Sequence, residues 1–182
     1  MADRVRRTLR GVGLTTDDAG PILRSHEHAM QRRRELLDDD HHPAFLHPGR
    51  TILVALEDAG VRDPTWLALA PLMDSVAPDL APDPGEWAAA LQAVPPLPLE
   101  PGATLEELVQ LDAEPLRVVL SEALDQLRHL HLIDDPEHQR ALTLRAEQRV
   151  LPLAARAGGT LDRRFRWWWR RVGRGFVERG ME

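Results

Sequence analysis

Apolar side chains recur at the 3.6-residue period of an α-helix along most of this chain, and that pattern limits the fold more than any other feature. Residues 116–130 show it most clearly, with one apolar face made by Leu116, Leu120, Ala123, Leu127 and Leu130. No segment alternates apolar and polar residues as a half-buried strand does. The 182 residues suffice for one domain with a substantial core. We therefore predict a compact, single-domain, all-α fold.

Prolines, glycines and capping residues divide the pattern into segments. We predict helices over residues 19–37, 48–60, 64–74, 86–93, 116–130 and 139–157, the last with a kink at Pro152. Thr104 and Glu107 form a capping-box pattern that predicts the start of another helix. Seven of the fifteen prolines fall between residues 78 and 101, which predicts a long, stiff loop over residues 77–102. The expected organisation is an N-terminal arm (1–18), a helical domain (19–160) and a C-terminal basic amphipathic helix (161–182) that docks on the domain.

Composition and charge exclude several classes of protein. The chain has no cysteine, so disulfides, thiolate catalysis and a thiolate-bound zinc are ruled out. Its net charge is −6, but the 22 residues from Leu161 onward carry +4 and the remainder carries −10. An acidic body of this kind does not suit a dedicated nucleic-acid-binding protein, although the basic C-terminal segment keeps that question open. The N-terminus lacks the apolar core of a secretory signal, and no segment is apolar over a membrane-spanning length, so we expect a soluble cytoplasmic protein.

Three side chains on separate predicted helices form a candidate metal site. His47 precedes one helix, Asp74 ends the apolar helix that follows it, and Glu122 lies on the flank of the buried face of residues 116–130. One imidazole and two carboxylates are a ligand set that divalent ions use where thiolates are absent. The sequence therefore offers a His–Asp–Glu site that would have to be assembled by the fold.

Four segments in order resemble motifs of the HD-domain phosphohydrolases, in particular the (p)ppGpp hydrolases of the stringent response and the small alarmone hydrolases. Residues 43–48 (PAFLHP), after an arginine-rich turn, resemble the family's P-Y-x-x-H-P, and residues 68–78 (ALAPLMDSVAP) resemble its A-A-L-L-H-D-x-V-E-D. Residues 120–130 (LSEALDQLRHL) resemble L-A-D-R-L-H-N-M-R-x-L, and residues 150–158 (VLPLAARAG) resemble Y-A-P-L-A-x-R-x-G. The resemblance covers about residues 22–158 and implies the helical HD-domain fold.

The resemblance also implies which residues would hold the family's metal ion, usually manganese. His47, Asp74 and Glu122 match three of the four ligands, whereas Met73 stands where the family has the central histidine. A thioether is a poor ligand for Mn²⁺ or Mg²⁺ because both are hard ions. Ala77 and Pro78 replace the two acids that follow the H-D motif. We therefore expect impaired catalysis and no bound cofactor, with Mn²⁺ as the metal if the chain is active.

Each candidate residue also has a structural interpretation. Asp74 would then pair with an arginine or with His47, and a salt bridge from His47 to Glu122 would satisfy both groups without a metal. The resemblance places Arg33 and Arg34 near a nucleotide, since guanidinium groups stack on purines and grip phosphates, but they could equally form a charged helix end.

The C-terminal segment combines arginine with aromatic residues. Leu161, Phe165, Trp168, Val172 and Phe176 share one helical face and are expected to dock on the body of the domain. Trp167 lies off that face, and we predict that it is exposed and faces a partner.

Taken together, the residues favour a degenerate HD-domain protein that acts as a nucleotide-binding or regulatory module, with a guanine nucleotide as the candidate ligand and a protein partner or self-association as further candidates. One alternative is an active metal-dependent (p)ppGpp or nucleotide phosphohydrolase that uses His47, Asp74 and Glu122. Another is a helical protein–protein adaptor that uses the tryptophan- and arginine-rich tail. We expect neither membrane nor nucleic-acid binding.

Overall fold

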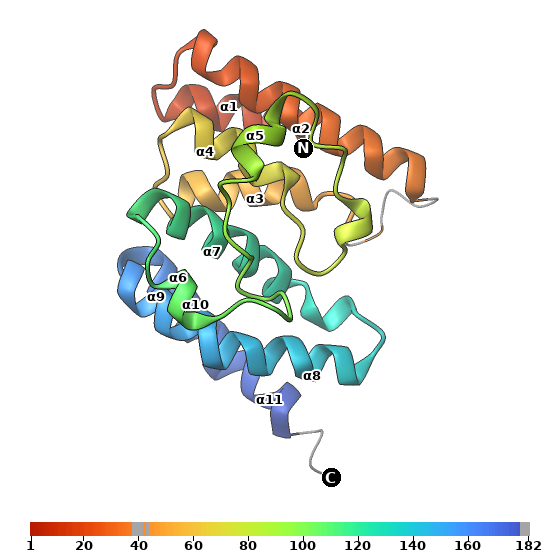
Figure 1. Ribbon diagram of the computed structural model, residues 1–182, viewed down its shortest axis with the longest axis vertical. Helices are drawn as coiled ribbons and strands as arrows, with labels where there is room; N and C mark the ends of the chain where they lie inside the picture. Colours follow the sequence, from red (N-terminus) through yellow and green to blue (C-terminus); the bar gives the residue numbers. More distant parts are fainter. Residues whose placement is uncertain (38–41, 43, 179–182) are drawn as a thin grey trace.

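A computed structural model describes residues 1–37, 42 and 44–178 of the chain. Over these residues the secondary structure is helical and contains no strand, which confirms the predicted all-α class. The helices form one body in which a central helix separates an N-terminal group from a C-terminal group (Figure 1).

The N-terminal group consists of α1 (Ala2–Gly11), α2 (Thr16–Leu36), α3 (His47–Glu57) and α4 (Pro64–Leu69). Two of them begin at side-chain caps. Thr15 and Asp18 form a reciprocal capping box before α2, and Asp63 accepts from the backbone N–H of Thr65 before α4. These local signals fix where each helix starts, and the packing of α2 against α4 and of α1 against α3 joins them into one layer.

Two N-terminal elements differ from the prediction. Residues 1–18, expected to be an arm, contain α1, whose Val5 and Leu9 are completely buried in the core with α3. The helix expected over residues 64–74 ends at Leu69 and continues only as a 3₁₀ turn, η1 (Ala70–Leu72). Pro71 lacks the backbone N–H that a continued α-helix needs, so Met73 is already extended and Asp74 lies beyond the helix.

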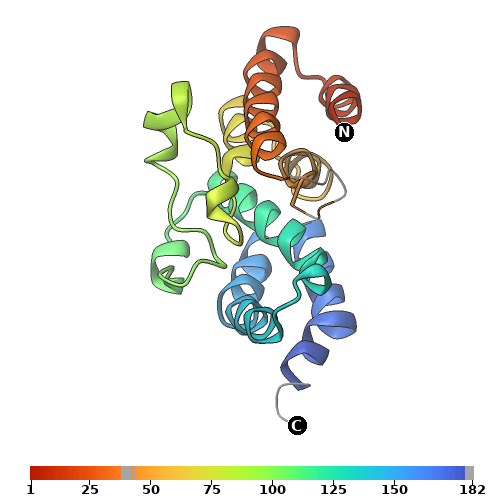
Figure 2. The same cartoon turned by 90° about the vertical axis from the view of Figure 1, so that its right-hand side faces the viewer.

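A long connection leads from Met73 to the central helix. It contains only short elements: η2 (Pro78–Leu80), η3 (Gly85–Trp87), α5 (Ala88–Leu91) and α6 (Leu105–Leu108). The Thr104–Glu107 capping box that the sequence predicts is present at the start of α6. In the turned view this connection runs along one side of the helical body, covering the edge between the two groups (Figure 2).

The central helix, α7 (Ala113–Arg128), is buried on several sides. Val118 and Val119 belong to the core shared with α1–α4, whereas Leu120, Leu124 and Leu127 belong to the core shared with the C-terminal helices. A helix in this position has little exposed face left for polar side chains. Its buried acids therefore need partners from neighbouring elements.

The C-terminal group contains η4 (Leu130–Leu132), α8 (Pro136–Arg145), α9 (Leu151–Ala157), α10 (Gly159–Trp168) and α11 (Arg174–Glu178). Two π-helical turns, η5 (Ala146–Val150) and η6 (Trp169–Gly173), interrupt the expected α-helices. The first of these turns, η5, directly precedes α9, which carries Pro152 in its first turn; the kink at this proline stays a prediction.

The C-terminal helix buries most of the predicted face. Leu161, Phe165 and Trp168 lie in the core, and the indole Nε1–H of Trp168 donates to the carbonyl of Leu127 at 2.8 Å. Beyond Trp168 the chain forms the wider π turn η6, so the next buried residue comes five positions later, at Gly173. Val172, which an α-helix would bury, is only half-buried. No helix within the described ranges has the length and apolar character needed to cross a membrane.

Candidate functional site

The fold brings the three predicted metal-ligand residues together in the interior. His47 comes from the first turn of α3, Asp74 from the segment after η1, and Glu122 from the middle of α7. All three side chains are buried, and one nitrogen or oxygen atom of each lies within 4.8 Å of the others. Among the described residues, this proximity makes them a possible metal-binding triad.

Asp74 is paired with Arg33 from the last turns of α2. The Nη2 of Arg33 donates to Oδ2 of Asp74 at 2.6 Å, and both side chains are almost completely inaccessible to solvent. The other carboxylate oxygen, Oδ1, accepts from the backbone N–H groups of Val76 and Ala77 and from Nε2 of Gln126, at 3.2, 2.8 and 2.8 Å. Both oxygens of Asp74 are therefore occupied by donors from the protein.

Arg33 itself is held in place on every side of its guanidinium group. Besides the bond to Asp74, its Nε donates to the carbonyl of Ala44 and its Nη1 to the carbonyl of Leu80, each at 2.9 Å. Burial lowers the pKa of Arg33 from its ordinary value, and the neighbouring Asp74 partly offsets that effect. The arginine thus connects α2, the loop before α3 and the segment after η1.

His47 lies between two hydrogen-bond acceptors. Its Nδ1 is 2.7 Å from Oδ2 of Asp125, and its Nε2 is 3.0 Å from the carbonyl oxygen of Met73. An ionised carboxylate and a carbonyl can only accept, so both ring nitrogens must carry a proton and His47 is an imidazolium cation. Burial alone would lower the pKa of His47, but the hydrogen bond to Asp125 and the nearby negative charges outweigh it and raise the pKa.

Asp125 is a member of this site that the sequence did not single out. Arg50 donates from Nε to Oδ1 and Oδ2 of Asp125, at 2.8 and 3.1 Å. Although burial would raise the pKa of Asp125, the bonds from His47 and Arg50 hold it below the ordinary value. On α7, Asp125 follows Glu122 by three residues, and on α3, Arg50 follows His47 by three residues. This helical spacing places Asp125 beside Glu122 and Arg50 beside His47, and it could have identified both residues from the sequence.

Glu122 is the least satisfied member of the triad. Its Oε1 accepts from the backbone N–H and the hydroxyl group of Ser75, at 2.9 and 2.7 Å. Its Oε2 is buried and has no hydrogen-bond partner among the described residues. Burial raises the pKa of Glu122 to about 7, because the hydrogen bonds from Ser75 and the positive charge of His47 only partly compensate for desolvation. The predicted salt bridge from His47 to Glu122 is absent, since His47 pairs with Asp125 instead.

The donor atoms of the triad do not fit a divalent metal ion in this arrangement. Both nitrogens of His47 carry protons, both oxygens of Asp74 accept hydrogen bonds, and only Oε2 of Glu122 has no partner. A metal ion would have to displace the guanidinium of Arg33 and a proton from His47. Cationic side chains already pair with Asp74 and Asp125, and Arg33 contacts Asp74 where the resemblance would place a metal ion.

A hollow of about 260 Å³ opens beside this cluster. It extends from the buried side chain of Asp74 and the half-buried side chains of Arg50 and Gln126 toward the segment that follows α7. The rest of its lining combines apolar groups with imidazoles: His42, Ala44, Val76, Ala77, His129, Leu132 and Ile133, with Asp134 at its edge.

Two histidines, His42 and His129, line the hollow. The Nδ1 of His42 accepts from the backbone N–H of Ala44 at 3.1 Å, so Nε2 carries the proton and can donate. The Nδ1 of His129 donates to the carbonyl of Asp125 at 2.7 Å, and burial lowers the pKa of His129. The hollow therefore offers a donor, an acceptor and a half-buried guanidinium from Arg50.

The two arginines predicted to contact a nucleotide lie in different environments. Arg33 is fully buried in the bonds described above, and Arg34 is exposed and pairs with Glu27 at 2.8 Å. Their contact with a nucleotide stays a prediction, and for Arg33 it would require rearrangement of the cluster. Trp167, by contrast, is 56% exposed, as expected of a residue that faces away from the core.

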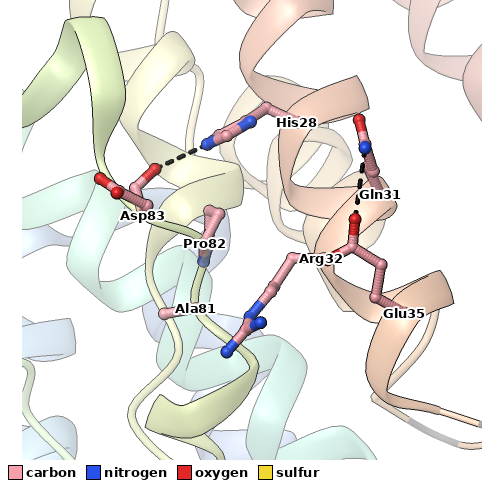
Figure 3. A pocket seen from close by; sticks show the side chains of 7 residues that line it. All are labelled: His28, Gln31, Arg32, Glu35, Ala81, Pro82 and Asp83. Carbon is pink, nitrogen blue, oxygen red and sulfur yellow. Dashed lines mark hydrogen bonds between the residues drawn. The ribbon is translucent and has the colours of Figure 1, made fainter.

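Another, more open hollow of about 630 Å³ lies between α2 and residues 81–83. Arg32 extends from α2 toward the segment that carries Ala81 and Pro82, while His28 contacts the carbonyl of Asp83 at 2.6 Å (Figure 3). Glu35 and Gln31 bond to each other at its rim. Opposite charges share this lining, so it has no clear preference for an anionic or a cationic ligand.

Comparison with known proteins does not identify a relative. A scan against protein-family models finds no match, and searches of curated proteins and of solved structures find none either. The described chain has an all-helical fold with a buried His–Asp–Glu triad.

Proposed function

We propose that this chain is a degenerate HD-domain protein that binds a small anionic ligand, with a guanine nucleotide as the first candidate, in the hollow beside the buried cluster and does not hydrolyse it. The observation that carries the proposal is the occupied state of the triad: Arg33 and a doubly protonated His47 fill positions that a catalytic metal site needs open. The four motif-like segments support the relationship to the HD-domain phosphohydrolases.

The chemistry of the hollow suits part of a nucleotide. Its volume of about 260 Å³ lies slightly below the usual range for small-molecule sites, so it would hold the base or a phosphate group while the remainder lies outside. Val76, Leu132 and Ile133 supply apolar contacts for a ring. Arg50 supplies a positive charge, and the ring nitrogens of His42 and His129 supply a donor and an acceptor.

The proposal is tested by isothermal titration of the purified chain with GDP and with ppGpp in the presence of EDTA. Binding without a metal is expected, and release of pyrophosphate from ppGpp is not expected after Mn²⁺ is added. Leu132→Asp should abolish binding, because it places a carboxylate in the wall of the hollow. Leu36→Asp is a matched control, since the two leucines are 45% and 44% exposed and only Leu132 lines the hollow.

The alternative function, a metal-dependent phosphohydrolase, is favoured by one observation, the approach of the triad atoms to within 4.8 Å. Stoichiometric Mn²⁺ together with ppGpp turnover that His47→Ala abolishes would establish it in place of the binding module. Absence of heat and of a thermal shift with every guanine nucleotide, together with no turnover, would overturn both forms of the proposal.

A further inference from the structure

The exposed side of the C-terminal helices carries the strongest concentration of positive charge in the described chain. Six residues define what we call the Arg–Trp surface: Arg163, Arg166, Trp167, Arg170, Arg171 and Arg174. All are exposed, whereas the opposite side of the same helices is buried against the core. The surface is therefore a stable feature of a docked element and does not depend on an unfolded tail.

The charges on this surface are weakly compensated. Arg166 pairs with Asp162 at 2.8 Å, but both lie where solvent screens such pairs, and Arg163 donates to the hydroxyl of Thr160. Arg170, Arg171 and Arg174 form no ion pair with a described residue. Several guanidinium groups are thus available to an anionic partner without the loss of a buried contact.

Trp167 stands among these arginines. A hollow of about 440 Å³ is lined by Trp167 together with Thr160, Arg163, Arg164, Arg166 and Arg170. The indole is 56% exposed and makes no ring contact with another described aromatic side chain. Guanidinium groups around an open aromatic ring are the combination that binds phosphates and stacks a base at the same time.

We propose that the Arg–Trp surface binds single-stranded nucleic acid, with Trp167 stacking on a base and the arginines contacting the phosphates on either side. Their arrangement supports this, because Arg163 and Trp167 of α10 and Arg170 of η6 line the same hollow. The overall charge of −6 argued against nucleic-acid binding at the level of composition. The fold changes that argument, because residues 161–178 alone carry six arginines and two acids, a charge of +4, and these arginines are all exposed on the C-terminal helices.

Two other partners fit the surface less well. A membrane would need an apolar face to insert, but Leu161, Phe165 and Trp168 are buried within the protein and Trp167 is left alone. A folded acidic protein would need an apolar core in the interface, which one tryptophan does not supply. A single strand is thin enough to lie along the arginines, whereas a broad anionic surface would also approach the acidic remainder of the chain.

Fluorescence anisotropy with a labelled 15-nucleotide oligo-dT tests the proposal, with oligo-rU as a second probe. At physiological salt the chain should bind with a dissociation constant of about 1–100 µM, and more tightly at low salt. Trp167→Ala should weaken binding at least about fivefold, whereas Trp167→Phe should retain most of the affinity because it keeps a stacking ring. The same sequence in a duplex should bind more weakly, since its bases are not open to the indole.

The arginines are tested by the salt dependence of the same binding. Arg170→Ala with Arg171→Ala should reduce the slope of log K against log salt by about 1.4, or about 0.7 for each lost phosphate contact. Arg7→Ala with Arg10→Ala removes the same charge from α1 and should leave the slope unchanged. Circular dichroism verifies that each variant is folded.

Three results would overturn the proposal. The first is no binding of either oligonucleotide at low salt. The second is equal affinity of the wild type and Trp167→Ala, which would reduce the surface to a general anion binder. The third is binding of phosphatidylserine vesicles or poly-glutamate with higher affinity than oligo-dT. None of these outcomes depends on the guanine-nucleotide site, because Leu132 and Trp167 line separate hollows.

Discussion

Replacement of Arg33 by methionine tests whether the guanidinium holds the buried cluster together. Methionine keeps most of the length of the side chain but removes the ion pair to Asp74 and the bonds to the carbonyl oxygens of Ala44 and Leu80. Asp74 would keep its donors on Oδ1 but would have none on Oδ2, at a site with almost no solvent access. Breaking a buried pair from one side typically costs about 3–5 kcal/mol, because the remaining charge is left uncompensated.

The assay is urea denaturation followed by far-UV circular dichroism, from which the free energy of unfolding is obtained for each variant. Arg34→Met is the matched control: it removes an adjacent arginine whose pair with Glu27 is exposed, and it should change stability by less than about 0.5 kcal/mol. Adding Asp74→Asn to Arg33→Met should restore part of the loss, with a coupling of about 1–3 kcal/mol, because it removes the unpaired charge.

The reasoning about Arg33 is refuted if Arg33→Met costs less than about 1 kcal/mol, or if it costs no more than Arg34→Met. It is also refuted if Asp74→Asn destabilises Arg33→Met further by its full single-variant amount, since the two side chains would then be energetically independent.

Three further changes probe other parts of the structure. Because the pKa of Glu122 is raised from 4.5 to about 7, the folded state binds this proton more tightly, and wild-type stability should fall as the pH rises from about 4.5 to 7. Glu122→Gln should remove that dependence, and above pH 7 its free energy of unfolding should exceed that of the wild type by up to about 3 kcal/mol. Urea denaturation at a series of pH values measures both effects. Gly173→Ala should lower the stability of the fold by about 1–3 kcal/mol in thermal unfolding, because a Cβ there would lie 2.7–2.9 Å from the rings of Trp168 and Trp169. Unchanged stability would show that the rings can move. Trp168→Phe should cost about 2–3 kcal/mol in the same assay, because it leaves the carbonyl of Leu127 unpaired and a small cavity; a loss below 0.5 kcal/mol would contradict that role.

Helical periodicity predicted the fold class and most helices because each amphipathic face is buried as the pattern indicates. The same pattern also indicates a buried, structural role for Arg33, whereas the family resemblance assigned this residue to a nucleotide contact. Along α2 the buried residues Ile22, His26, Ala29 and Met30 recur at helical spacing, and Arg33 continues that row. An arginine in a row of buried residues has to find acceptors inside the protein, so the row predicts a core role better than a ligand contact.

Other features could not be obtained from periodicity. A π turn adds a residue to one turn of the helix, and nothing in the sequence before Gly173 marks the change. The pairing of His47 with Asp125 depends on how α3 crosses α7, which a one-dimensional pattern does not contain. In the motif-like segment 120–130, Asp125 stands where the resembling family has a histidine, whereas in the structure it is the partner of one, His47.

The balance of charge inside the cluster bears on which ligand can bind next to it. Arg33, His47 and Arg50 are cationic, and their bonded partners Asp74 and Asp125 are anionic. Glu122, with a pKa of about 7, contributes about half a negative charge at neutral pH, so the buried groups together are slightly positive.

A divalent cation would add to that excess in a region with little water, unless His47 lost its proton and Glu122 was fully ionised. A phosphate group in the adjoining hollow would instead be attracted by the excess, with Arg50 reaching its lining. The same residues that resemble a metal site therefore favour an anion over a cation at neutral pH. That preference should weaken as the pH rises and the imidazolium is lost.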